Sequence, residues 1–144
     1  MDNTKTVIFQ DFARKAKERL EEKKKKRTKQ LYVGDLDMTL TIRGISDEEY
    51  LEITEMEGMS EIDRDKYLIY YACPDLQETA RIMVEEGSLA DSARYKIADI
   101  FQAVDRTALC RAILSLSGLS GDNTVKDAPE PAERISEAEE VKNL

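Results

Sequence analysis

The chain has 144 residues, of which 41% are hydrophobic and 36% are charged, and its formal net charge is −8. This length suits one domain with a modest core. No apolar run approaches the ~20 residues that a membrane-spanning helix needs, and the first residues do not have the pattern of a signal peptide. We therefore expect a cytoplasmic protein with no membrane partner.

Histidine is absent from the sequence. The commonest general base and the commonest metal ligand are therefore missing, and Ser/His or Cys/His nucleophile arrangements cannot form. The sequence also contains no glycine-rich phosphate loop and no paired-cysteine metal motif. We expect no enzyme, no catalytic residue, no metal site and no cofactor. The two cysteines, Cys73 and Cys110, are expected to be reduced and buried.

Charge is distributed unevenly along the chain. Residues 1–29 contain eleven Lys or Arg and five Asp or Glu, a net charge of +6. Residues 30–144 contain eleven and twenty-five, a net charge of −14. A basic arm on an acidic body favours self-docking or an acidic partner.

Residues 4–27 have the pattern of an amphipathic helix, with apolar side chains at helical spacing on one face. The apolar stripe consists of Phe9, Phe12, Ala13, Ala16 and Leu20. Two interpretations remain open. The stripe packs against the chain's own core, or it is exposed and binds a partner, for which the candidate residues are Phe9, Phe12, Ala16 and Leu20. The basic stretch from Lys23 to Arg27 that follows is either a solvated helix end or an anion-binding patch.

The apolar pattern changes to a period of two within residues 30–43, where Leu36, Met38, Leu40 and Ile42 alternate with polar residues. This pattern predicts a strand with one buried face. We expect it to pair with the short run 31–33 through a two-residue turn at Gly34 and Asp35, with the glycine at positive φ. Because a lone hairpin is marginal in water, it must pack on the helical body or pair with another chain.

The later part of the chain shows several helix boundaries. Ser46 can cap a helix while Glu49 returns the hydrogen bond, which predicts a capping box. Asp75 and Asp105 are in position to cap two later helices. Gly118 fits the position just after the end of the last helix.

A further helix is expected to end before Pro74, and a helical pattern over 88–104 is expected to break near Tyr95. The sequence thus predicts a mostly helical α+β fold, with an N-terminal helix, a small β-hairpin and a bundle of four to five short helices. We expect the basic helix 1–29 and the body 30–119 to form one domain, followed by a disordered acidic tail over 120–144.

Three segments resemble the tail assembly chaperones of contractile-tailed phages and prophages of Gram-positive bacteria. Residues 40–49 (LTIRGISDEE) are similar to the family's passage from a strand into a helix with Arg, Ile, Ser or Thr, and two Glu at fixed places. Residues 67–76 (YLIYYACPDL) are similar to its helix that ends in a Pro-Asp-Leu turn, and residues 113–119 (ILSLSGL) to its final helix end. The resemblance covers roughly residues 7–121, although the hairpin turn is shorter here than is usual in the family.

The resemblance implies a non-enzymatic protein of the host bacterial cytoplasm that is absent from the mature virion. Such a protein binds the tape measure protein, keeps it soluble and assists assembly of the tail tube, so the tail tube protein is a further partner. A homo-oligomer remains open. The alternative is a small nucleic-acid-binding or regulatory protein that uses the stretch from Lys23 to Arg27, but no aromatic residue or glycine is interleaved with these cations, which does not favour nucleic acid.

Overall fold

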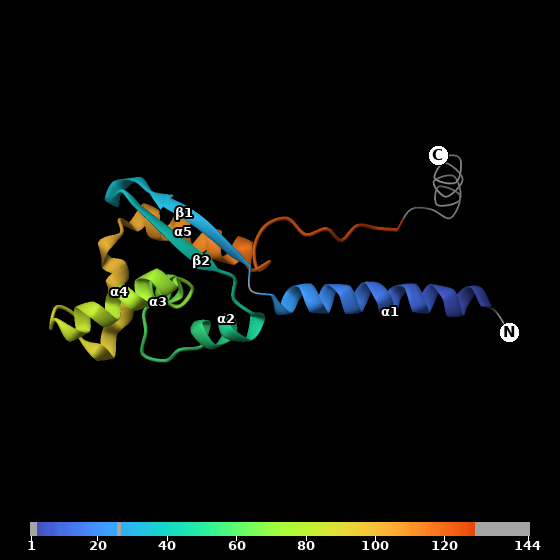
Figure 1. Ribbon diagram of the computed structural model, residues 1–144, viewed down its shortest axis with the longest axis horizontal. Helices are drawn as coiled ribbons and strands as arrows, with labels where there is room; N and C mark the ends of the chain where they lie inside the picture. The colour runs from blue at the N-terminus through green and yellow to red at the C-terminus, as the bar shows by residue number, and fades with distance from the viewer. Residues whose placement is uncertain (1–2, 26, 129–144) are drawn as a thin grey trace.

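The computed structural model describes residues 3–25 and 27–128. A long N-terminal helix, a two-stranded antiparallel hairpin and five further helical segments follow one another along the chain, as shown in Figure 1. The elements are α1 (Asn3–Lys24), β1 (Thr28–Val33), η1 (Gly34–Leu36), β2 (Met38–Arg43), α2 (Asp47–Thr54), α3 (Glu61–Tyr71), α4 (Pro74–Glu85), η2 (Asp91–Ile100) and α5 (Ala103–Leu116). The predicted fold class, mostly helical α+β, is confirmed.

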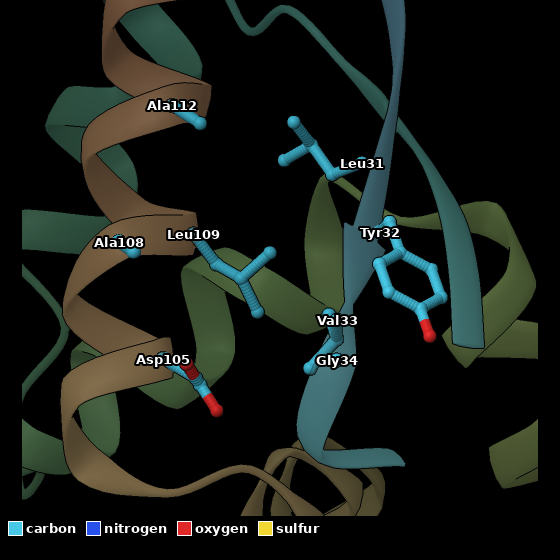
Figure 2. Close-up of a pocket in the computed structure, with 8 residues that line it drawn as sticks. All are labelled: Leu31, Tyr32, Val33, Gly34, Asp105, Ala108, Leu109 and Ala112. Carbon is cyan, nitrogen blue, oxygen red and sulfur yellow. The ribbon is translucent and has the colours of Figure 1, made fainter. Parts of the chain in front are cut away.

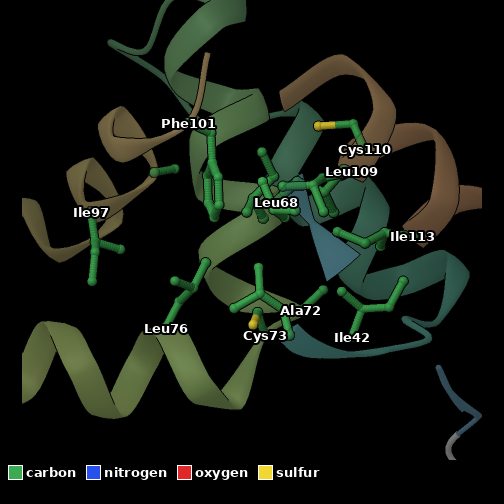
Figure 3. Packing of buried hydrophobic residues seen from close by; sticks show 14 of the residues in the cluster. Ile42, Leu68, Ala72, Cys73, Leu76, Ile97, Phe101, Leu109, Cys110 and Ile113 are labelled. Carbon is green, nitrogen blue, oxygen red and sulfur yellow. The ribbon is translucent and has the colours of Figure 1, made fainter. Parts of the chain in front are cut away.

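The core lies between the hairpin and the helices that follow it. Of the seventeen buried apolar residues in the described part of the chain, twelve come from the segment between Leu68 and Ile113. The helix α3 contacts α2, α4, η2 and α5, so it is the central element of the body. Figure 3 shows Leu68 of α3 and Ala72, which follows the last residue of α3, surrounded by side chains from the neighbouring elements.

The hairpin has one buried face, as its alternating sequence predicts. Leu31 pairs with Leu40 and Val33 with Met38, and the side chains of Val33, Leu40 and Ile42 are buried. The hairpin therefore packs on the helical body, which resolves the choice left open by the sequence. One edge is also joined to the helices, because the N–H of Arg43 donates to the carbonyl of Ala72 at 2.8 Å.

The predicted two-residue turn is wrong. The connection is a 3-10 turn over Gly34–Leu36 followed by Asp37, which is the residue in the left-handed region, with φ of 47°. Gly34 does not have a positive φ, and Leu36 belongs to the turn rather than to the strand. Aspartate is among the residues that tolerate this conformation best, and the Asp37 carboxylate also accepts a hydrogen bond from the Tyr32 hydroxyl at 2.7 Å.

The predicted helix boundaries are confirmed at three places and wrong at two. The helix α3 ends at Tyr71, before Pro74, as predicted. The capping box of Ser46 and Glu49 is present, and Gly118, with φ of 73°, follows the end of α5. The N–H of Leu119 donates to the carbonyl of Leu114 at 2.8 Å, which completes a Schellman ending. In contrast, Asp75 and Asp105 are not caps, because α4 and α5 begin earlier.

The early start of α4 has a simple reason. Proline is favoured at the first position of a helix, where its missing N–H costs nothing. Pro74 takes that position and Cys73 precedes it as the N-cap without a side-chain hydrogen bond. Likewise, Gln102 precedes α5, so Asp75 and Asp105 lie in the first turn, where their charge still suits the helix dipole.

Two further expectations concern the last third of the chain. Within the helical pattern predicted over 88–104, η2 consists of two short 3-10 segments. They meet at Ala93, two residues before the predicted break. Residues 120–128 form no regular helix or strand, and the rest of the predicted tail, 129–144, lies outside the described residues.

Candidate protein-binding surface

The helix α1 leaves the body rather than packing on it. Figure 1 shows it projecting from the end of the molecule where β1 begins and β2 ends. A backbone hydrogen bond from the N–H of Gly44 to the carbonyl of Arg27, at 2.8 Å, joins the end of this connection to the body. The interpretation in which the stripe packs against the chain's own core is therefore wrong.

The apolar stripe of α1 is open to solvent along the described part of the helix. Phe9 is 65% exposed, Phe12 58% and Leu20 62%, and Ala16 between them is also exposed. The two phenylalanine rings touch edge to face, with centroids 6.3 Å apart. We define the α1 stripe as Phe9, Phe12, Ala16 and Leu20, the residues that the sequence singled out. A contiguous row of exposed aromatic and aliphatic side chains is typical of a protein-binding surface.

Charged residues around the stripe stabilise α1 without help from the body. Asp11 forms ion pairs with Arg14 at 2.5 Å and with Lys15 at 3.1 Å, at helical spacings of three and four residues. The hydrogen bond from Arg14 is the main reason why the pKa of the Asp11 carboxyl is lowered. Arg14 also faces Glu18 at 3.5 Å. These pairs support the polar face of the helix, while the described residues of the body leave its apolar face uncovered.

The basic stretch lies where α1 meets the hairpin. Lys23 and Lys24 form the last turn of α1, where positive charge suits the helix dipole, and Lys25 and Arg27 are exposed. Lys26 lies outside the described residues.

The three segments that carry the family resemblance meet at one corner of the body. The Arg43 guanidinium lies 3.5 Å from the Glu49 carboxylate, donates to the carbonyl of Tyr71 at 3.1 Å, and stacks 4.5 Å from the Tyr71 ring centroid. The Tyr71 hydroxyl in turn donates to Glu49. From the last segment, the Ser117 hydroxyl oxygen accepts the N–H of Ile45 at 2.8 Å. We call Arg43, Glu49 and Tyr71 the corner cluster.

The corner cluster is a structural unit. Burial acts to raise the pKa of the Glu49 carboxyl, but the hydrogen bonds from Tyr71 and Ser46 and the charge of Arg43 outweigh burial, so the pKa is lowered. The carboxylate is thus already occupied by donors from three elements.

Asp75 has a different role from the one expected. Its carboxylate accepts the backbone N–H of Thr41 at 2.9 Å, across 34 residues of sequence. Thr41 lies on β2, and no strand in the described part of the chain pairs with the outer edge of β2. The hydrogen bond therefore covers part of that edge and fastens α4 to the hairpin.

Sequence reasoning missed a groove between β1 and α5. Its volume is about 180 Å³, and Figure 2 shows Leu31 and Leu109 facing each other across it. The lining residues are Leu31, Tyr32, Val33, Gly34, Asp105, Ala108, Leu109 and Ala112. The groove exists because Ala108 and Ala112, one helical turn apart, are too small to fill the space beside the strand. That spacing of alanines is the only signal for it in the sequence.

Other kinds of site find little support in the described residues. Cys73 and Cys110 are free and buried, as predicted, and burial raises the pKa of both thiols. Within residues 3–25 and 27–128, no three acidic or cysteine side chains converge in a way that could hold a metal ion. In the same ranges, no helix combines the length and the apolarity needed to cross a membrane.

The chain matches no protein-family model, no curated protein and no solved structure.

Proposed function

We propose that the protein is a phage or prophage tail assembly chaperone that binds the tape measure protein through the α1 stripe. The observation that carries this proposal is the uncovered stripe on a projecting helix, together with the resemblance of residues 40–49, 67–76 and 113–119 to that family. The proposed setting is the host cytoplasm before the virion is complete, where the chaperone keeps its partner soluble and assists assembly of the tail tube.

The chemistry of α1 suits a long apolar helix as its partner. Phe9 and Phe12 each present on the order of 100 Å² of surface, and burying both corresponds to roughly 5 kcal/mol of gross transfer free energy. Association costs about 4 kcal/mol or more, so one such contact alone is weak and reversible. A chaperone that must later give up its partner to the tail tube needs a contact of this strength, repeated along the partner.

The acidic body explains how such a complex would remain dispersed. Residues 30–119 contain eight Lys or Arg and eighteen Asp or Glu, a net charge of −10. When several copies coat an apolar helix through α1, their bodies point outward and repel one another. This repulsion favours solubility of the coated partner.

The test is co-expression with the tape measure protein of the same phage or prophage, followed by pull-down and a solubility assay. The variant is Phe9→Asp with Phe12→Asp. Its control is Val7→Asp with Gln10→Asp, which adds the same two charges within the same turns of α1 but away from the stripe. We expect the wild type and the control to capture and solubilise the partner, and the stripe variant to fail.

Thermal melting separates loss of binding from loss of folding. Because the stripe is exposed, both variants should change the free energy of unfolding of the body by less than about 0.5 kcal/mol. If the stripe variant captures the partner as well as the control does, α1 is not the binding surface. If the folded wild type captures nothing, the chaperone proposal is wrong, and salt-sensitive binding of DNA or RNA by the same sample would then favour the basic stretch as the functional surface.

A further inference from the structure

The groove between β1 and α5 has the size of one aromatic side chain. Its volume is about 180 Å³, whereas an engineered cavity of about 150 Å³ in another protein accepts benzene. Leu31, Val33, Leu109 and Ala112 supply apolar walls, and Ala108 at the mouth is exposed to solvent. An aromatic ring could therefore enter from outside without a change of the fold.

The chain itself has two exposed phenylalanines, but they cannot reach their own groove. Phe9 and Phe12 lie on α1, which points away from the body in Figure 1. The strand β1 runs from the junction in the opposite direction (Figure 1), and its residues Leu31 and Val33 line the groove. A second copy of the chain can present them. We propose that two copies exchange their α1 helices, so that Phe12 of each enters the β1–α5 groove of the other.

The spacing along the chain supports this arrangement. Phe12 is twelve residues from Lys24, the last residue of α1, which is about 18 Å along a helix. The groove-lining residues Leu31 and Val33 are three and five residues from Thr28, the first residue of β1, which is about 10–17 Å along a strand. The two distances are similar in size. A two-fold axis near the junctions therefore brings each Phe12 beside the other copy's groove, and the reciprocal contact closes the assembly as a dimer.

Charge favours the same pairing. The helix α1 contains seven Lys or Arg and four Asp or Glu, whereas residues 30–119 carry a net charge of −10. Asp105 lines the groove, and Asp35 lies beside it on the turn, where it accepts a hydrogen bond from Gln102 at 3.2 Å. Basic α1 against the acidic body is attractive, whereas two basic α1 helices packed only on each other would repel. This inference does not rest on the proposed function, although a dimer of this kind would cover the stripe until a partner displaces it.

The first test is the molar mass of the full-length protein in solution, measured by light scattering or sedimentation over a wide concentration range. Ala108→Arg fills the groove with a larger side chain. It also places a positive charge where the Lys and Arg residues of the other copy's α1 would lie. We expect it to weaken dimerisation on the order of tenfold to a hundredfold, which is the effect of losing one buried phenylalanine contact. Phe12→Ala should weaken dimerisation to a similar extent. The control is Val104→Arg, on the same helix at a 71% exposed position that does not line the groove.

The second test fixes the register of the two chains. Chains with Phe12→Cys and chains with Ala108→Cys, carrying different tags, are mixed and oxidised. The native thiols are buried, so we expect a disulfide only between the two kinds of chain. A monomer at every concentration, a dimer that resists Ala108→Arg, or the absence of the mixed disulfide at a concentration at which the two tagged chains sediment as a dimer would each overturn the proposal.

The dimerisation tests and the capture of the tape measure protein test the two proposals independently. Ala108 lies off α1, so Ala108→Arg leaves the α1 stripe intact and should capture the tape measure protein at least as well as the wild type does. Dimerisation without capture would refute only the chaperone proposal, and capture without dimerisation would refute only the α1 exchange.

Discussion

Replacing Glu49 with Gln removes the charge that ties the corner cluster together while preserving the shape of the side chain. In the wild type, Glu49 lies 3.5 Å from the Arg43 guanidinium, accepts the Tyr71 hydroxyl, and accepts the N–H of Ser46 at 3.1 Å. Gln keeps an acceptor for one of these donors. It loses the charge assistance of all three and leaves the half-buried Arg43 without a counter-charge.

The expected cost follows from this geometry. Hydrogen bonds to a charged group contribute about 1.5–3 kcal/mol, and the Glu49 side chain is 28% exposed, so screening reduces the value. We expect Glu49→Gln to lower the free energy of unfolding by about 1–2 kcal/mol. For a body of this size that corresponds to roughly 4–16 °C in Tm. In a double-mutant cycle with Tyr71→Phe, the coupling should be about 0.5–1.5 kcal/mol, because the two side chains share a hydrogen bond.

The effect should also depend on pH in a definite direction. The pKa of the Glu49 carboxyl is lowered below its ordinary value of 4.5 in the folded state. Its contribution to stability is therefore complete above pH 4.5 and is lost as the pH falls through the lower, folded-state pKa. Urea unfolding of the wild type and Glu49→Gln should differ most at neutral pH and converge in acid. An equal cost at both pH values, or a cost below about 0.5 kcal/mol at neutral pH, would refute the role given to this charge.

The glycines and the thiols give the remaining predictions. Gly118→Ala should lower the free energy of unfolding by about 1–2 kcal/mol, because its φ of 73° strains any residue with a Cβ, and urea unfolding measures the loss. Gly44→Ala is the matched control and should cost less than about 0.5 kcal/mol, since its φ is not positive and a Cβ there would meet nothing closer than 3.7 Å. Cys73 and Cys110 should react with a thiol reagent near neutral pH far more slowly than in urea, because burial raises the pKa of both, that of Cys110 to about 12. Fast labelling of the native protein would contradict the burial of these residues.

Features that depend only on neighbouring residues were predictable from the sequence. The capping box needs a serine and a glutamate three residues apart, and both partners lie within one turn. The Schellman ending at Gly118 is equally local. The buried face of β2 followed from its period of two, because only one phase of the alternation places Leu40 and Ile42 toward the core. The register did not follow, because the longer turn pairs Val33 with Met38.

Features that depend on distant residues were missed. Aspartate is a favoured N-cap residue, but α4 begins at Pro74, one residue before Asp75. The Asp75 carboxylate instead accepts the backbone N–H of Thr41, 34 residues away. No local pattern contains that partner. The groove was missed for a similar reason, because Ala108 and Ala112 read as ordinary helix formers until β1 is known to lie beside them. The exposure of the α1 stripe was left open by the sequence because periodicity identifies an apolar face without identifying what covers it.

The position of the corner cluster bears on what a family resemblance can mean for this chain. The segments 40–49, 67–76 and 113–119 are fastened to one another by Arg43, Tyr71 and Ser117, so their residues are explained by the stability of the body. A resemblance in these segments therefore supports a shared fold more directly than a shared partner. The α1 stripe, in contrast, is exposed and takes no part in the core, so the fold of the body does not explain its apolar side chains. Substitutions at Phe12 and Ala108 can therefore test the two proposals without disturbing the fold, because both side chains are exposed and neither belongs to the core cluster.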